Sequence, residues 1–397
     1  MKFRPILSLA LTIVLVAIAA LPMSAAAAPP AGKVQLWSPE NSATTHKPTL
    51  PEAIEDAASF DLITPLKGTY RKYVTEMKAV NSDLVLLSYM NGTLAQSSEG
   101  GVYPDEWYLK DATGARVVSG SWGNYLMNPS SEGWIGSRIA QAEEFIAFSG
   151  YDGVLMDVMG TAPIDEDYSS GVPINPATGQ PWTKAEWLNA TSALAARVKA
   201  AIAPRTVFVN GLGSGPRYAN PAAPSAQLLN GIDGGHAEAF LRNANEPISR
   251  YPTAKNWLKE VDMLVDATAR GKSVLTLTKV WAAGTQAEKD AWHRYALASF
   301  LMGASEKTYF TFQYAREDDP TVTMPLWSTL VGSPLGNYFA LPGGVYQRSF
   351  ANGISVVNPS LSPVTLPLGG TYRTLLGELV TSLTLQPNEG DVLIRVS

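Results

Sequence analysis

The sequence contains no cysteine, so disulfide bonds and thiolate chemistry are both excluded. Its three histidines, His46, His236 and His293, show no metal-ligand spacing, and we expect neither a metal nor a cofactor. No apolar run beyond the N-terminal region is long enough to span a bilayer. Basic runs are also missing and the formal net charge is −5, so nucleic acid is not an expected partner. A chain of 397 residues without disulfides must rely on a large core, as one large domain plus a small one.

The N-terminus has the pattern of a secretory signal peptide. Lys2 and Arg4 precede an apolar run from Ile6 to Leu21, and small residues follow. We expect residues 1–27 to be the signal peptide, with cleavage after Ala26 or Ala27, because a later cut would leave Pro29 at the new N-terminus. A retained membrane anchor is the less favoured alternative, since the apolar run is short for a span. The mature chain would then be secreted or extracytoplasmic, with no membrane partner after cleavage.

Short apolar runs alternate with helix-like segments through most of the chain. This alternation predicts right-handed βαβ units and a parallel sheet, and eight strands favour a closed α/β barrel, a (β/α)8 TIM barrel over residues 30–340. Helices are expected at Tyr70–Asn81, Trp134–Phe148, Lys184–Ala203, Ala254–Ala269 and Ala287–Met302. The expected strands are Val34–Trp37, Asp61–Pro65, Asp83–Met90, Gly153–Met159, Thr206–Gly211, Ile232–Phe240, Ser273–Trp281 and Lys307–Tyr314.

Residues 343–397 change to short strands and turns. The dipeptide Asn352-Gly353 between two apolar runs is a strong hairpin signal. We therefore expect a small antiparallel β domain here, sandwich-like in character, after a boundary near Leu341-Pro342.

Two carboxylates fall at the ends of predicted barrel strands. Asp157 ends the run that begins at Gly153, and Glu238 lies on the inward face of the strand that includes His236. The C-terminal ends of barrel strands are where enzymes of this architecture place their chemistry. Two facing carboxylates are what glycoside cleavage needs, because one must donate a proton and the other must be ionised. Each acid could instead be a structural ion-pair partner.

Other polar residues end neighbouring strands and could hold a sugar. The 10 Trp and 16 Tyr residues also favour carbohydrate, since aromatic faces stack on sugar C–H surfaces. Two long insertions, 91–128 and 160–183, follow strand ends and should overhang the active face. Lys279 could in addition steady a carboxylate. The candidate substrate-binding residues are Tyr89, Asn91, Trp107, Trp122, Trp182, Asn210, His236, Lys279 and Gln313.

Several short segments carry a resemblance to a known family. They are Gly150–Asp157, Asn128-Pro129, Trp134, Val207–Gly211, Gly231–Phe240, Tyr346–Phe350, Asn352-Gly353, Val356–Pro359 and Gly369-Gly370-Thr371-Tyr372. In them the chain resembles the hypothetical glycoside hydrolase family fifteen. The resemblance implies a TIM-barrel glycosidase in which Asp157 matches the strand-four acid and Glu238 the strand-six acid. By analogy with several barrel glycosidases, Asp157 would be the nucleophile or base and Glu238 the proton donor.

Two functions remain open from the sequence. The favoured one is a secreted hydrolase that cleaves O-glycosidic bonds of an external poly- or oligosaccharide with two carboxylates. The alternative is a non-catalytic carbohydrate-binding or cell-surface protein on the same barrel. The acid pair discriminates between them, because a binding protein does not need both carboxylates.

Overall fold

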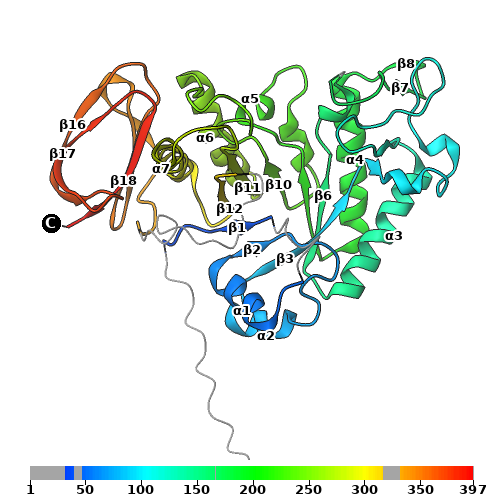
Figure 1. Ribbon diagram of the computed structural model, residues 1–397, viewed down its shortest axis with the longest axis horizontal. Helices are drawn as coiled ribbons and strands as arrows, with labels where there is room; N and C mark the ends of the chain where they lie inside the picture. The colour runs from blue at the N-terminus through cyan, green and yellow to red at the C-terminus, as the bar shows by residue number, and fades with distance from the viewer. Residues whose placement is uncertain (1–31, 40–46, 166, 316–330, 397) are drawn as a thin grey trace, which may run out of the picture.

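A closed parallel barrel forms the larger part of the molecule (Figure 1). The computed structural model describes residues 32–39, 47–165, 167–315 and 331–396. A parallel bridge between Leu36 and Phe310 joins the first strand to the last and closes the sheet. The predicted barrel is thereby confirmed. Its eight strands, in spatial order, are β1 (Trp37–Ser38), β2 (Leu62–Ile63), β3 (Val85–Asn91), β6 (Gly153–Asp157), β9 (Thr206–Asn210), β10 (Gly234–Ala237), β11 (Ser273–Lys279) and β12 (Thr308–Gln313).

Helices surround the barrel, and side-chain caps start several of them. In α4 and α7 the side chain of a threonine N-cap accepts a hydrogen bond from the backbone N–H of the glutamate three residues later. The side chain of that glutamate accepts a hydrogen bond from the backbone N–H of the threonine. All five predicted helices are present, whereas the sequence reading missed α1, which also begins with a capping box at Thr49. The helices are α1 (Leu50–Ser59), α2 (Val74–Val80), α3 (Glu132–Ser149), α4 (Lys184–Ile202), α5 (Gly215–Tyr218), α6 (Ala254–Ala269) and α7 (Gln286–Gly303).

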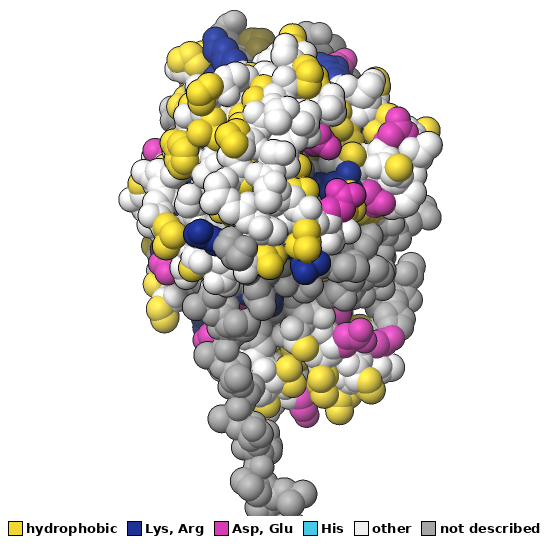
Figure 2. Space-filling view, turned by 90° about the vertical axis from the view of Figure 1, so that its left-hand side faces the viewer, with side chains coloured by type: hydrophobic (Ala, Val, Ile, Leu, Met, Phe, Trp, Pro, Cys, Tyr) yellow, Lys and Arg dark blue, Asp and Glu magenta, His cyan; other side chains and the backbone are white. Residues whose placement is uncertain are grey.

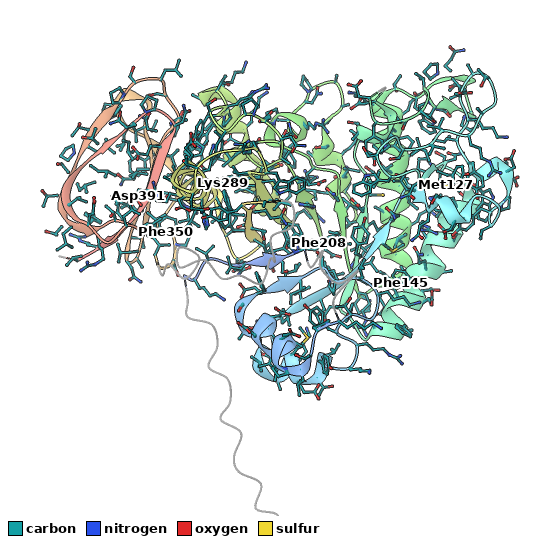
Figure 3. All side chains as sticks on the ribbon, viewed as in Figure 1. Met127, Phe145, Phe208, Lys289, Phe350 and Asp391 are labelled. Atoms are coloured by element: carbon teal, nitrogen blue, oxygen red, sulfur yellow. The ribbon has the colours of Figure 1, made fainter. Side chains whose placement is uncertain are left out.

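The barrel interior holds its own apolar core, separate from the larger core between strands and helices. Phe208, labelled in Figure 3, lies among the barrel strands and belongs to this interior core. Its buried members are Trp37, Leu62, Leu87, Leu155, Phe208, Leu275 and Leu277. The interior is therefore packed with side chains and is not a pore.

The two long insertions pack together beside α3 and α4 (Figure 1), and we name residues 92–128 with 160–183 the loop subdomain. Backbone bonds join the two insertions, as when Gly120 N donates to Tyr168 O at 2.8 Å. Two short antiparallel strand pairs, β4 (Leu94–Ala95) with β5 (Tyr125–Leu126) and β7 (Ile174–Asn175) with β8 (Gln180–Pro181), stiffen it. A core that includes Leu109 and Trp182, and that packs on Trp187 of α4, anchors the subdomain to the barrel.

The C-terminal strands form one curved antiparallel sheet, not two stacked sheets, in the order β13-β14-β15-β18-β16-β17. The expected hairpin is confirmed, with Phe350 paired to Gly353 across the Ala351-Asn352 turn. One face packs on α7, where Ser355 Oγ donates to Ala298 O at 2.9 Å. The strands are β13 (Phe339–Ala340), β14 (Tyr346–Phe350), β15 (Gly353–Asn358), β16 (Val364–Arg373), β17 (Leu379–Leu385) and β18 (Glu389–Arg395).

The outer side of this sheet shows no concentration of charge or of apolar side chains. Figure 2, which views the molecule from that side, shows mostly uncharged polar and backbone atoms with scattered hydrophobic groups. Thr365, Ser382 and Thr384 are among its exposed residues. The predicted signal peptide, residues 1–27, lies outside the described residues, and none of the described helices is long and apolar enough to cross a membrane.

Candidate active site

A cavity of about 350 Å³ opens at the C-terminal ends of the barrel strands. Strands β3, β6 and β9 and the segment after β10 form its floor, and the loop subdomain forms part of its wall. Both predicted acids lie in it. The residues of interest that line it are Tyr89, Asn91, Trp122, Asn124, Asp157, Tyr168, Asn210, Arg217 and Glu238.

One amide holds the two carboxylates together. Asn210 Nδ2 donates to Asp157 Oδ1 at 2.7 Å and to Glu238 Oε2 at 2.9 Å. The two acceptor oxygens therefore cannot lie further apart than these bonds placed end to end, about 5.6 Å. This upper limit lies below the gap of roughly 6.5–9.5 Å that inverting pairs keep and well below the roughly 14 Å that would separate the two acids.

Three donors surround Asp157. Besides Asn210, the Tyr89 hydroxyl donates to Oδ2 and the Val158 backbone N–H donates to Oδ1 at 2.8 Å. Burial, together with the charge on Asp157, raises the pKa of Tyr89, so this phenol stays protonated as a donor. The carboxyl group is thus held in one orientation by side chains from two neighbouring strands and by the backbone of the adjoining loop.

The backbone immediately after Asp157 is strained. Val158 has φ 61°, in the left-handed region that a β-branched residue rarely adopts. Thr93 Oγ1, in the loop after β3, donates to Val158 O, and Met159 N donates to Asn210 O of β9 at 2.8 Å, so groups on both sides hold this turn in place. Strain of this kind costs about 1–3 kcal/mol and concentrates at functional sites. Here it aims the Val158 N–H at the carboxylate.

Glu238 forms an ion pair with a buried lysine. Lys279 Nζ, at the end of β11, lies 2.8 Å from Glu238 Oε1, and the lysine side chain is only 11 % accessible. Burial alone would raise the pKa of Glu238, but the Lys279 ammonium outweighs it and, with His236 and the Asn210 amide, lowers that pKa to about 2. Glu238 is therefore ionised, and its side chain is 47 % accessible because it faces the cavity.

Asp157 has the opposite tendency. Burial, followed by the negative charge of Glu238, raises the pKa of Asp157 above its ordinary value, although its three donors oppose that rise. Two carboxylates this close do not both ionise freely, and the one without a cation takes the proton first. The environments of the pair thus separate an ionised Glu238 from a protonatable Asp157.

Several predicted binding residues do not line the cavity. Trp182 is packed in the loop-subdomain core, T-shaped against Trp187. Trp107 stacks on Tyr103 and fills the space beside Gly133, whose missing side chain admits its ring. Both were candidate binding residues because they lie on long loops after strand ends, but these loops have a core of their own. Only Trp122 of the three predicted tryptophans faces the cavity, with 61 % of its surface exposed.

Three further candidates lie beneath or beside the cavity. His236 is buried edge-on against Trp37, and burial lowers the pKa of its imidazole to about 4. Gln313, at the end of β12, is also buried and its Oε1 has no partner among the described residues. Lys279 reaches the site through Glu238 and not through the cavity wall. Of these three residues, Lys279 is the one that binds an acid.

Three polar cavity residues were not among the predicted site candidates: Asn124, Tyr168 and Arg217. Tyr168 lies in the 160–183 insertion, where burial and then the charge of Asp157 raise the pKa of its phenol to about 12. Arg217 lies on α5, in a stretch whose glycines and prolines give no helix signal. Strand-end positions predict residues on strands, whereas these three come from the insertions and from a short helix turn.

Comparisons with known proteins agree with this architecture. The sequence model of the hypothetical glycosyl hydrolase family 15 matches residues 78–354, more than half of the chain. No curated protein matches. An α-amylase from Malbranchea cinnamomea superposes with a TM-score of 0.50 at 9% identity, covering 91% of this chain and 96% of that one. At this identity the likeness shows the fold alone.

Two other solved structures align at slightly lower scores. The noncanonic maltogenic α-amylase AmyB from Thermotoga neapolitana has a TM-score of 0.49 and 10% identity, covering 92% of this chain and 99% of that one. Amy13B from Eubacterium rectale has a TM-score of 0.47 and 10% identity, covering 92% and 94%.

Proposed function

The chain belongs to the hypothetical glycosyl hydrolase family 15, and from that premise we propose that it is a glycosidase that cleaves O-glycosidic bonds of a poly- or oligosaccharide. The observation that carries the proposal is the pair Asp157 and Glu238, held by one amide in an open cavity with only Glu238 paired to a lysine. A carbohydrate-binding protein on the same barrel would not need two acids with opposed proton affinities. The pair therefore favours catalysis over binding.

The electrostatics favour the reverse of the role assignment made by analogy. Glu238, ionised beside Lys279, is the nucleophile, and Asp157, which takes the proton, is the general acid. The separation of at most about 5.6 Å between the Asn210-bound oxygens supports retention of configuration. Inverting enzymes keep a wider gap to admit a water molecule.

The reaction then has two steps. Glu238 attacks the anomeric carbon, the bond to the leaving oxygen breaks, and Asp157 gives that oxygen its proton. Asp157, now ionised, takes a proton from water as the water oxygen attacks the same carbon and releases Glu238. Lys279 and Asn210 are positioning residues, since each acts through a carboxylate.

The substrate would enter beneath the loop subdomain. Trp122 offers an exposed aromatic face at the cavity wall, and Tyr168 and Asn124 add polar atoms beside it. This combination suits the alternating C–H and hydroxyl surfaces of a sugar ring. We propose further that the protein is exported, as its first 27 residues suggest, so that the glycan is external. N-terminal sequencing of the protein recovered outside the cytoplasm should then begin after Ala26 or Ala27.

The proposed activity is tested by screening the purified protein against diverse glycans for new reducing ends. Glu238→Gln should lose activity on the order of 10⁴-fold or more while keeping its fold. The matched control is Asp152→Asn, an isosteric change at the opposite end of β6, where the carboxylate pairs with Lys78. Equal activity in wild type and Glu238→Gln on every cleaved glycan would remove the acid pair from catalysis.

A further inference from the structure

Arg217 is the basic side chain among the described residues that line the cavity. The other two charged groups of the lining are the acids Asp157 and Glu238, which the Asn210 amide bridges, and Glu238 is also paired with Lys279. Among the described residues no acidic side chain forms an ion pair with Arg217. Arg217 therefore presents a cation at the cavity wall that the described acids do not pair.

The turn that carries Arg217 is firmly anchored. Gly215 N donates to the buried carboxyl of Glu260 at 2.7 Å, and the Tyr218 hydroxyl donates to Asp266 at 2.5 Å. A Cβ at Gly215 would lie 2.3 Å from the backbone of α6, so only glycine allows α5 to approach this closely. The helix turn is fixed on α6, and the position of Arg217 does not depend on a loose loop.

The side chain of Arg217 lies across Gly213, which also lines the cavity. A Cβ at Gly213 would come within 2.8 Å of Arg217 Cδ, and Gly213 has φ 72°, a conformation that favours glycine. The absence of a side chain at this position leaves room for the arginine stem along the cavity wall. Arg217 is exposed, and no hydrogen bond from its guanidinium to a described residue is present.

We propose that Arg217 binds an anionic substituent of the glycan substrate, a carboxylate or a sulfate ester. This inference rests on the proposed glycosidase function and names the class of substrate for the same site. A guanidinium presents a planar pair of donors that matches such oxyanions, and it is less hydrated than an ammonium. A neutral glycan would leave this anchored charge without a counterpart.

The net charge of −5 does not oppose such binding at short range. At physiological ionic strength the Debye length is about 8 Å, so distant acidic groups are largely screened while a direct contact is not. Measurements in about 0.15 M salt therefore report the local contact.

The test measures binding in the Asp157→Asn background, which slows cleavage of bonds with poor leaving groups and carries no charge at position 157. Each anionic probe is compared with a neutral counterpart: polygalacturonate with its carboxyl-reduced product, and dextran sulfate with dextran. Calorimetry measures the four affinities. We expect one anionic probe to bind about tenfold or more tighter than its neutral counterpart, as a charge-assisted pair predicts. Adding Arg217→Gln should abolish that preference. The control Arg205→Gln removes the same charge at the opposite end of β9 and should keep it.

Preference for the carboxylated or for the sulfated probe alone identifies the anion. Three outcomes would overturn the inference. The anionic and neutral probes could bind equally, the preference could survive Arg217→Gln, or neither polyanion could bind. These outcomes are separate from the proposed function, because hydrolysis is scored with the wild-type protein. Cleavage of neutral glycans that depends on Glu238, with no anionic preference, would leave the glycosidase proposal standing and remove this one.

Discussion

The mouth of the barrel and the layers beneath it are built from the same strands, yet they are chemically opposite. Beneath the mouth the inward side chains are apolar and buried, and they form the interior core. On four of these strands the inward side chain two residues further along is polar and either lines the cavity or binds a residue that does. The pairs are Leu87 and Tyr89, Leu155 and Asp157, Phe208 and Asn210, and Leu277 and Lys279.

The difference assigns separate tasks to the two layers. A single step of the two-residue strand period converts core into site, so the apolar layer supplies stability directly under the groups that would react. The mouth layer contains the features that lower stability, which are a strained Val158, a buried lysine and two close acids. Substitutions in the mouth should change activity and its pH dependence, whereas substitutions beneath it should change stability alone.

The largest effect on the mouth side, after loss of the nucleophile, is expected for Asp157→Asn. Loss of the proton donor should reduce kcat/KM roughly 10²- to 10⁴-fold on substrates with poor leaving groups. Aryl glycosides with acidic phenols need little proton donation and should be cleaved much more nearly at the wild-type rate. Steady-state kinetics across a series of leaving groups measures the slope. A uniform loss on all leaving groups would instead make Asp157 the nucleophile, as the analogy first suggested.

The strongest effect beneath the mouth is expected for Leu275→Ala. Leu275 is fully buried in the interior core, and a cavity there should lower the free energy of unfolding by about 2–5 kcal/mol. Denaturant titration measures the loss. The folded fraction should keep the wild-type pH profile of kcat/KM. A shifted profile would show that the two layers are not independent, and would break the comparison.

Lys279→Met should move the acid limb of the pH profile. With Lys279 present, the pKa of Glu238 is about 2, so the nucleophile stays ionised at all ordinary pH values. Without Lys279, burial and the neighbouring acid raise the pKa of Glu238. The variant should therefore lose activity at a higher pH than the wild type when the pH is lowered. The alkaline limb, where Asp157 loses its proton, lies above the ordinary aspartate pKa in wild type.

Lys279→Arg is the matched control, because it keeps the cation. Its acid limb should stay near that of wild type. Identical profiles for Lys279→Met and wild type would mean that Lys279 does not set the charge of Glu238.

The smallest effect is expected at the rim, for Trp122→Ala. Loss of one exposed stacking face should weaken glycan binding roughly threefold to tenfold without changing the pH profile. Trp107→Ala is a useful contrast, because Trp107 packs beside Gly133 and away from the cavity. Binding titrations on folded protein measure both. Unchanged affinity in Trp122→Ala removes its role as a stacking platform.

The strand-end residues of the mouth could be predicted from the sequence because a periodicity and a topological rule both apply to them. Inward faces repeat every two residues, and parallel strands all end at the same rim, so Asp157, Asn210, Glu238 and Lys279 could be placed together. The same logic located the eight strands. Strand periodicity does not predict α1, which is short. The capping signal of Thr49 and Glu52 is the sequence feature that indicates this helix.

The loops were not predictable in the same way. Trp182 and Trp107 carry the same residue type as Trp122, and only the packing of one insertion on the other decides which ring stays exposed. Arg217 depends on two glycines that let α5 and its side chain approach their neighbours. The roles of the acids depended on which of them Lys279 reaches, a contact between neighbouring strands that carries no signal in sequence spacing.

The central claim is that Glu238 is ionised while Asp157 holds the proton, and carboxyl ¹³C NMR tests it most directly because it needs no substrate. Protein labelled at the Asp and Glu carboxyl carbons would be titrated, with Asp157→Asn and Glu238→Gln assigning the two signals. The account predicts that Glu238 stays ionised to about pH 2 and that Asp157 titrates above the ordinary aspartate value. A Glu238 signal that protonates at a higher pH than that of Asp157 would contradict it.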